Sequence, residues 1–106
     1  MRSRRSEKLM TGTTQSTEGL DPRRRRLLFR SWHRGMREMD LIMGRFADRH
    51  IAALGPTELD EFERLSGLPD PELLGWITGE TAVPADYDTA VFRKLRDFHW
   101  SGDGGR

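Results

Sequence analysis

Apolar residues recur at helical spacing along most of the chain, and the first such segment begins at a recognisable start signal. Asp21 precedes a proline, and this pair supplies an N-cap oxygen and a residue suited to the first helical position. A helix is therefore predicted from there to about His33, with Leu28 and Trp32 four residues apart on one face. Gly35 follows at a C′ position, where a helix end favours a left-handed backbone.

The next two predicted helices follow closely. The second has apolar residues near a 3.6-residue period, namely Met39, Ile42, Met43, Phe46 and Leu54. Gly55 and Pro56 are predicted to end it. Thr57 and Asp60 resemble a capping box for the third helix, and Gly67 provides its stop. The predicted inner face of this third helix consists of Leu59, Phe62 and Leu65.

Two more helices complete the pattern. Asp70 again precedes a proline, which predicts the start of a short fourth helix that ends at Gly79. Its apolar residues are Leu73, Leu74 and Ile77. Residues 81–85 contain a proline and are predicted to form a loop. A fifth helix is expected from about Asp86, and its apolar stripe is Tyr87, Val91, Leu95 and Phe98.

The pattern as a whole predicts an all-α protein. No segment shows the sustained alternation of a strand, so a compact five-helix bundle over residues 21–100 is the expected fold. Residues 1–20 are rich in Arg, Ser and Thr and offer almost no apolar surface, so they are predicted to form a flexible tail. The Gly-rich residues 101–106 are expected to be a flexible tail as well.

Composition limits the classes of protein that this chain can represent. The chain has 106 residues, a formal net charge of +1 and no cysteine, which excludes disulfide scaffolds, Cys-based zinc sites and thiol nucleophiles. No apolar run approaches the roughly 20 residues of a membrane span, and no secretory signal is recognisable at the N-terminus. We therefore expect a soluble intracellular protein without membrane insertion.

The sequence carries no signature of an active site. The three histidines, His33, His50 and His99, lie on different predicted helices without metal-ligand spacing. No activated nucleophile, glycine-rich phosphate loop or paired-carboxylate pattern is recognisable either. We predict that the protein is not an enzyme and has no catalytic, cofactor-binding or metal-binding residues of its own.

Nucleic-acid binding is the main alternative from another class. Arg23 to Arg26 form a basic run, and residues 1–26 hold eight Lys or Arg against three Asp or Glu. A solvated helix start explains the same run. The one turn that resembles a helix-turn-helix, at residues 65–77, also contains Asp70 and Glu72, which would repel phosphates. A small regulator that binds nucleic acid through its Arg-rich segment therefore stays the alternative hypothesis, and the main prediction is no nucleic acid.

The densest cluster of mixed charge lies between the first two predicted helices, where Arg34, Gly35, Arg37 and Glu38 follow one another closely. A helix stop with solvated charges is one interpretation. A tight turn needs only the glycine, however, whereas two arginines and a glutamate on short backbone form a directional hydrogen-bonding patch. Trp32 beside it is an aromatic residue of the kind that anchors protein interfaces. The second interpretation is therefore a patch that binds a partner protein.

With these residues the sequence resembles the succinate dehydrogenase assembly factor 2 family, whose hallmark is an Arg-Gly-x-x-Glu motif between the first two helices. Arg34, Gly35 and Glu38 match its three fixed positions. The flanks agree too: residues 26–33 read Arg-Leu-Leu-Phe-Arg-Ser-Trp-His, and Met39-Asp40 follows the motif. The resemblance continues through residues 73–78 and 84–86 and covers about residues 22–99. The long Arg-rich N-terminal extension departs from the family, and the resemblance supplies no function for it.

The resemblance implies a chaperone-like assembly factor with a five-helix fold. Its expected partner is the flavoprotein subunit of succinate dehydrogenase, with the related fumarate reductase subunit as a further client. The factor would promote covalent FAD attachment while the FAD stays on the client, which joins the flavin to its own histidine. The expected contact patch comprises Arg34, Gly35, Arg37, Glu38, Asp40 and Trp32.

Two further expectations concern the state of the protein. A monomer in the bacterial cytoplasm is expected, with the mitochondrial matrix as the alternative location. A direct FAD carrier is a third functional hypothesis, which a yellow purified protein would favour.

Overall fold

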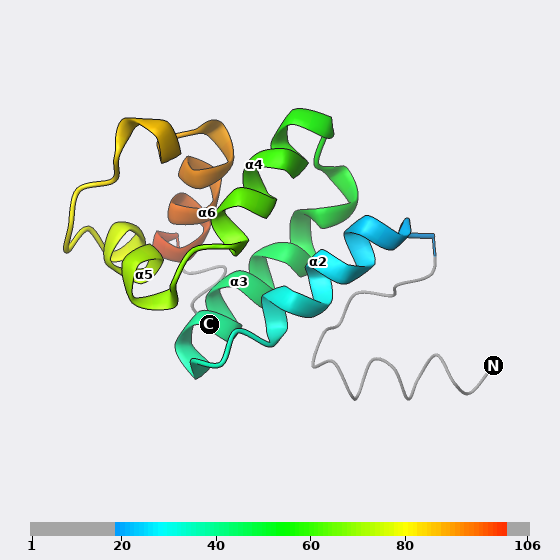
Figure 1. The fold of residues 1–106 in the computed structure, drawn as a ribbon, viewed down its shortest axis with the longest axis horizontal. Coiled ribbons are helices and arrows are strands. Elements are labelled where there is room, and N and C mark those ends of the chain that lie inside the picture. The colour runs from blue at the N-terminus through cyan, green and yellow to red at the C-terminus, as the bar shows by residue number, and fades with distance from the viewer. Residues whose placement is uncertain (1–18, 102–106) are drawn as a thin grey trace. The chain divides into compact units, whose positions relative to one another are not determined.

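A computed structural model of the protein describes residues 19–101, and within this range the chain forms five α-helices, two 3₁₀ turns and no strand. The prediction of an all-α protein with five helices is thus confirmed. The chain divides into an N-terminal unit, residues 1–52, and a C-terminal unit, residues 53–106 (Figure 1). The helices are α2 (Pro22–Trp32), α3 (Arg37–His50), α4 (Pro56–Ser66), α5 (Asp70–Thr78) and α6 (Ala90–Trp100).

The first helix, α2, begins where the sequence predicts. Asp21 is the N-cap, Pro22 occupies the first helical position, and the backbone N–H of Arg24 donates to Asp21 Oδ1 at 2.8 Å. Leu20, assigned above to the flexible tail, is buried, and its carbonyl accepts a hydrogen bond from Arg25 Nη1 at 2.8 Å. Burial of the apolar Leu20 side chain away from water stabilises the fold. The prediction that Leu20 belongs to the flexible tail is therefore corrected. Residues 1–18 and 102–106, most of the two predicted tails, lie outside the described residues.

The N-cap of α2 predicts a pH dependence of stability. The hydrogen bond from the backbone N–H of Arg24 and the charge of Arg24 lower the pKa of Asp21. A lowered pKa in the folded state means that the stabilisation is present at neutral pH and is lost as the carboxylate becomes protonated in acid. The melting temperature of Asp21→Ala should therefore lie below that of the wild type near pH 7 and approach it towards about pH 2. A gap that stays constant across this range would contradict the assignment.

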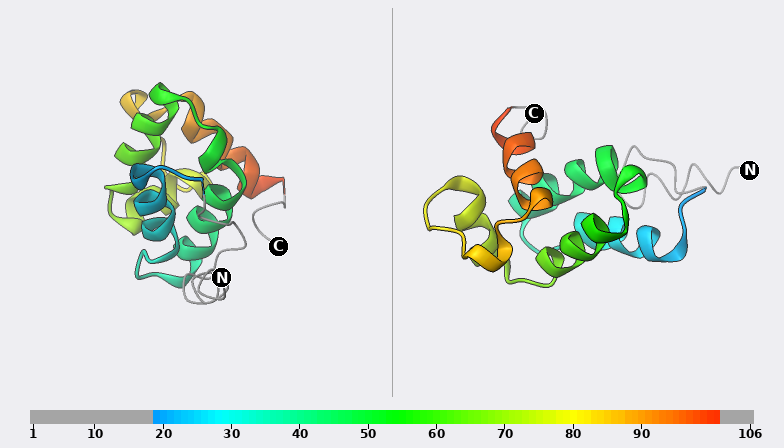
Figure 2. Two further views of the ribbon diagram at one scale, coloured as in Figure 1. Left: turned by 90° about the vertical axis from the view of Figure 1, so that its right-hand side faces the viewer. Right: turned by 90° about the horizontal axis from the view of Figure 1, so that it is seen from above.

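In the N-terminal unit, α3 runs antiparallel to α2 and packs against it, as the views in Figures 1 and 2 show. Four of the five apolar residues predicted for its inner face are buried in α3, and Leu54 is buried beyond its end. The α-helix ends at His50 and a 3₁₀ turn, η1 (Ile51–Ala53), follows, so the predicted end at Gly55 is corrected. Arg24 Nε donates to the carbonyl of Ile51 at 2.9 Å, which ties this turn to α2.

The C-terminal unit contains α4, α5 and α6, with α6 packed against both other helices. The start of α4 differs from the predicted Thr57 cap. Gly55 is the N-cap, Pro56 is the first helical residue, and the N–H of Gly55 donates to Glu58 Oε1 at 3.3 Å. The capping glutamate is thus two residues before the predicted Asp60, because the proline already fits the first turn. The predicted inner face, Leu59, Phe62 and Leu65, is buried, and Gly67 caps the end.

Helix α5 and its N-cap each begin one residue earlier than predicted. Pro69 is the N-cap and Asp70 is already helical, so Asp70 supplies first-turn charge and no cap. The carboxylate still favours the positive end of the helix dipole. Gly79 ends the helix with a φ of +84°, as a left-handed C-cap should. Leu73 and Ile77 are fully buried, whereas Leu74 is half-buried.

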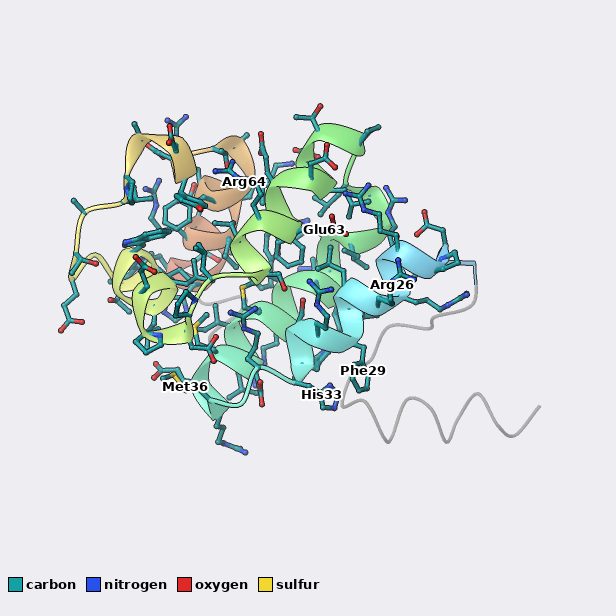
Figure 3. All side chains as sticks on the ribbon, viewed as in Figure 1. Arg26, Phe29, His33, Met36, Glu63 and Arg64 are labelled. Atoms are coloured by element: carbon teal, nitrogen blue, oxygen red, sulfur yellow. The ribbon has the colours of Figure 1, made fainter. Side chains whose placement is uncertain are left out.

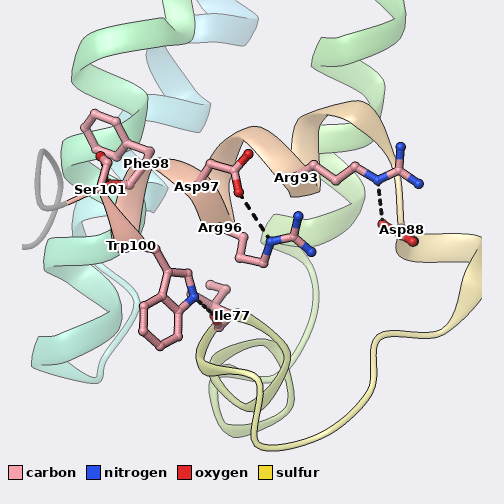
Figure 4. A network of polar contacts seen from close by, with 8 residues as sticks. All are labelled: Ile77, Asp88, Arg93, Arg96, Asp97, Phe98, Trp100 and Ser101. Carbon is pink, nitrogen blue, oxygen red and sulfur yellow. Dashed lines mark hydrogen bonds and ion pairs between the residues drawn. The ribbon is translucent and has the colours of Figure 1, made fainter.

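Helix α6 begins at Ala90, four residues after the predicted start. The 3₁₀ turn η2 (Ala85–Tyr87) comes first, and Thr89 then caps α6 by accepting from the N–H of Phe92 at 3.2 Å. Phe92 is fully buried although the predicted stripe omitted it. Figure 4 shows the ion pair of Arg93 with Asp88 and the hydrogen bond from Trp100 Nε1 to the carbonyl of Ile77, both in this unit.

Candidate partner-binding site

The turn between α2 and α3 carries the charged cluster. The N–H of His33 donates to the carbonyl of Arg30, which closes the last turn of α2. Gly35 then has a φ of +100°, and Met36 is extended as the N-cap of α3. The predicted positive φ of Gly35 is confirmed, although the glycine stands two residues after the C-cap and not one. A side chain at this φ is disfavoured, so glycine suits the turn.

Asp40 fixes the shape of this turn from the first turn of α3. Its Oδ1 accepts the backbone N–H of Arg34 at 2.5 Å, and its own N–H donates to the carbonyl of Met36 at 2.9 Å. One half-buried residue therefore holds both ends of the turn. Asp40 was predicted as a contact residue, and its geometry gives it a positioning role within the chain.

Arg37 and Glu38 are the outward-facing charges of the cluster. Both are exposed in the first turn of α3, and within residues 19–101 neither side chain has a hydrogen bond or ion pair. A carboxylate at Glu38 is favoured by the positive end of the helix dipole. The two side chains are thus available for hydrogen bonds to a partner.

The remaining space at the turn is open. A Cβ built on Gly35 would meet no atom of residues 19–101 within 4 Å other than those of its two chain neighbours, and the residue itself is exposed. Arg34 beside it is half-buried. The backbone at Gly35 can therefore be approached closely by another molecule.

Trp32 differs from the expected outward anchor. Its indole packs against α3 at Gly44, where no side chain intervenes, and Nε1 donates to Asp48 Oδ1 at 3.3 Å. The residue is half-buried. Much of the ring thus stabilises the α2–α3 pair, and its role toward a partner stays a prediction.

The structure brings together five of the six predicted patch residues, namely Arg34, Gly35, Arg37, Glu38 and Asp40, within one turn. It also places the exposed ring of Phe29 one helical turn before His33 (Figure 3). Sequence reasoning did not select Phe29. The signal was present, because burial of Leu27 and Leu28 on one side of α2 leaves position 29 on the other side.

The other described residues add two findings. No helix among residues 19–101 is long and apolar enough to cross a membrane. The same residues contain no group of three or more His, Cys, Asp or Glu side chains arranged to hold a metal ion.

Comparison with known proteins identifies the family to which this sequence is similar. The model of the family described as "Flavinator of succinate dehydrogenase" matches residues 25–99, a stretch that includes the whole turn and all of α3 to α5. The chain belongs to this family. The resemblance drawn from the Arg-Gly-x-x-Glu motif is therefore confirmed.

Proteins similar to this chain include bacterial and mitochondrial assembly factors. The FAD assembly factor SdhE of Acetobacter pasteurianus is 36% identical over 78 residues, which cover 74% of this chain and 72% of that protein. The mitochondrial succinate dehydrogenase assembly factors 2 of Dictyostelium discoideum and Debaryomyces hansenii are 38% and 39% identical over 80 and 81 residues. These matches cover 76% and 74% of this chain, but only 56% and 57% of the two mitochondrial proteins.

Proposed function

We propose that this chain binds the flavoprotein subunit of succinate dehydrogenase and promotes covalent attachment of FAD to it. The observation that carries the proposal is the turn in which Gly35 and Glu38 are exposed beside the half-buried Arg34, in a chain of the flavinator family. The related fumarate reductase subunit is proposed as a further client.

The physical basis of the activity would be positioning. A protein that holds the client's domains in the arrangement required for the bond removes part of the entropic barrier, which can amount to several kcal/mol. The turn suits such a grip, because Asp40 fixes its backbone while Arg37 and Glu38 project charge. A preorganised patch loses little entropy on binding. The client, which holds the FAD, would form the bond with its own histidine and then release the factor.

We propose that the factor works without an active site or cofactor of its own. Its three histidines have aromatic neighbours in the described residues: His33 stacks on Phe29, the ring of His50 is tilted against that of Phe46, and His99 contacts Trp100 edge to face. Each histidine thus has an aromatic neighbour, and His33 lies on the exposed surface at the end of α2. Purified protein without flavin absorbance would support this part of the proposal, and stoichiometric flavin would favour the carrier hypothesis.

The cytoplasm is the proposed location, with the mitochondrial matrix as the alternative, because both bacterial and mitochondrial relatives exist. The factor is proposed to act as a monomer that forms a transient complex with its client.

The test of this function is the variant Glu38→Ala. Loss of a carboxylate from an exposed first turn should lower the free energy of unfolding by at most about 1 kcal/mol. Client binding should weaken much more, because a charged contact is removed from the patch. Covalent flavin on the client, measured by its fluorescence after denaturing electrophoresis, should fall in cells in which this chain is the only such factor.

A matched control is Glu72→Ala, because Glu72 is also an exposed glutamate in the first turn of a helix, here α5. It should lose a similar amount of stability and leave flavin attachment unchanged. Full covalent flavin with Glu38→Ala would show that the turn does not contact the client.

A further inference from the structure

The outer face of α2 is an exposed surface that the proposed contact turn does not use. Leu27, Leu28 and Ser31 are the buried residues of this helix. The helical period places another set of side chains on the opposite side, and all of them are exposed: Arg25, Arg26, Phe29, Arg30 and His33. We call these five residues the arginine–phenylalanine face.

The aromatic centre of this face is held in place although it is open to water. Phe29 is 50% exposed, and its ring stacks on that of His33 with centroids 4.0 Å apart and an angle of 18° between the planes. His33 Nδ1 lies 2.7 Å from the carbonyl of Phe29. Since a carbonyl oxygen can only accept, this nitrogen donates and fixes the imidazole beneath the phenyl ring. A fixed aromatic surface loses little conformational entropy when a partner covers it.

Cations surround this ring. Helix α2 contains no acidic residue, and Arg26 and Arg30 flank Phe29 at three positions before and one position after it. Within residues 19–101 the guanidinium groups of Arg26 and Arg30 have neither a hydrogen bond nor an ion pair. A surface depression beside the ring is lined by Arg25, Arg26, Phe29 and Arg30. An apolar ring between uncompensated guanidinium groups suits an apolar side chain flanked by carboxylates.

We propose that the arginine–phenylalanine face is a second contact surface for the flavoprotein client, and that it takes an acidic segment carrying an apolar or aromatic side chain. This inference rests on the proposed function. Two observations select a protein ligand: His33 adjoins Arg34, so the face continues into the contact turn, and that turn contains Glu38 and Asp40. Carboxylates next to the face would repel the phosphates of a nucleic acid but can accept hydrogen bonds from a protein.

The face and the turn would therefore grip the client together. The turn, which Asp40 holds by a hydrogen bond, offers a positive and a negative side chain, whereas the face offers cations and one aromatic ring. Binding energy in protein interfaces concentrates in a few aromatic and arginine residues, so Phe29 should be the energetic centre of the face. The arginines should contribute mainly to association rate and salt dependence.

The test measures the dissociation constant of the full chain for the purified flavoprotein subunit at low and high salt. Phe29→Ala should weaken binding by about tenfold or more, since alanine substitution at an interface hot spot has effects of this size. The double variant Arg26→Gln/Arg30→Gln should weaken binding several-fold at low salt and reduce its salt dependence. It leaves the stack of Phe29 on His33 intact, so it tests the charges separately.

The charge control is Arg93→Gln/Lys94→Gln on the exposed surface of α6, which removes the same number of positive charges, here from ion pairs with Asp88 and Glu58. This control should bind the client like the wild type. All variants should remain helical and unfold cooperatively on heating. Wild-type affinity of both face variants, with Glu38→Ala still impaired, would overturn the inference and leave the proposed function standing. A wild type that does not bind the flavoprotein subunit at all would overturn both. Binding of a single-stranded oligonucleotide that depends on Phe29, together with unaltered client affinity, would assign the face to nucleic acid and also overturn the inference.

Discussion

A Gly35→Val variant is expected to stay folded and to lose the flavoprotein subunit. The φ of +100° at this residue costs a side chain roughly 1 kcal/mol, and a β-branched one more. Apart from the two neighbouring residues, no atom of residues 19–101 lies within 4 Å of an added Cβ, so no clash with another element adds to the backbone strain. This loss is small beside a typical stability of about 5 to 15 kcal/mol. An isopropyl group at the centre of the turn would, however, prevent close approach of the client's backbone.

Thermal stability and client binding, measured on the same variants, separate the two effects. Gly79→Val is the matched control, because Gly79 also has a positive φ, +84°, and open space around its Cβ position, but belongs to the C-terminal unit. It should lose similar stability and keep the client. Gly35→Ala should be intermediate in binding. If binding by Gly35→Val falls only in proportion to unfolding, the glycine is merely a helix stop.

The second large effect concerns the packing of the Trp32 indole against Gly44 of α3. A Cβ on Gly44 would lie inside the van der Waals contact of the indole, 2.7 Å from its Cε3 atom, so Gly44→Ala must displace the ring. Overpacking of this kind costs about 1 to 3 kcal/mol, and the better helix propensity of alanine returns up to about 1 kcal/mol. We expect a net loss of roughly 1 to 2 kcal/mol, seen as a fall of about 5 to 15 °C in melting temperature.

The sign of this effect should reverse when the indole is absent. In a Trp32→Ala background the space beside Gly44 is free, so Gly44→Ala should stabilise the chain through helix propensity alone. A double-mutant cycle on melting curves measures this coupling. Equal destabilisation by Gly44→Ala in both backgrounds would show that the indole does not rest on this glycine.

The helices could be predicted from the sequence because their signals are local. Asp21 with the following proline and Gly79 each act within one turn, and both behave as expected. The start of α6 could not be placed in this way. Tyr87 fits the period of Val91 and Leu95, but its ring lies 5.2 Å from that of Trp76 and beneath the guanidinium of Arg64. These contacts are distant in sequence, and they belong to a 3₁₀ turn that precedes the Thr89 cap.

In the candidate site, too, the local features could be predicted from the sequence and the longer-range contacts could not. The positive φ of Gly35 and the charges around it were evident from residue types and spacing. The sequence does not reveal that Asp40 bonds back to the N–H of Arg34, because that contact depends on the path of the turn. Nor does it reveal which glycine faces Trp32, since Gly44 lies one helix away and twelve residues along the chain.

The position of Trp32 also allows the N-terminal unit to be followed by tryptophan fluorescence. The chain has three tryptophans, and Trp32 is the one within residues 1–52. It stands next to His33 at the start of the turn, whereas Trp76 and Trp100 belong to the other unit. With Trp76 and Trp100 replaced by phenylalanine, the tryptophan fluorescence of this chain would originate beside the contact turn alone. If the proposed client docks at this turn, energy transfer from the indole to the client's FAD would quench this emission when the complex forms.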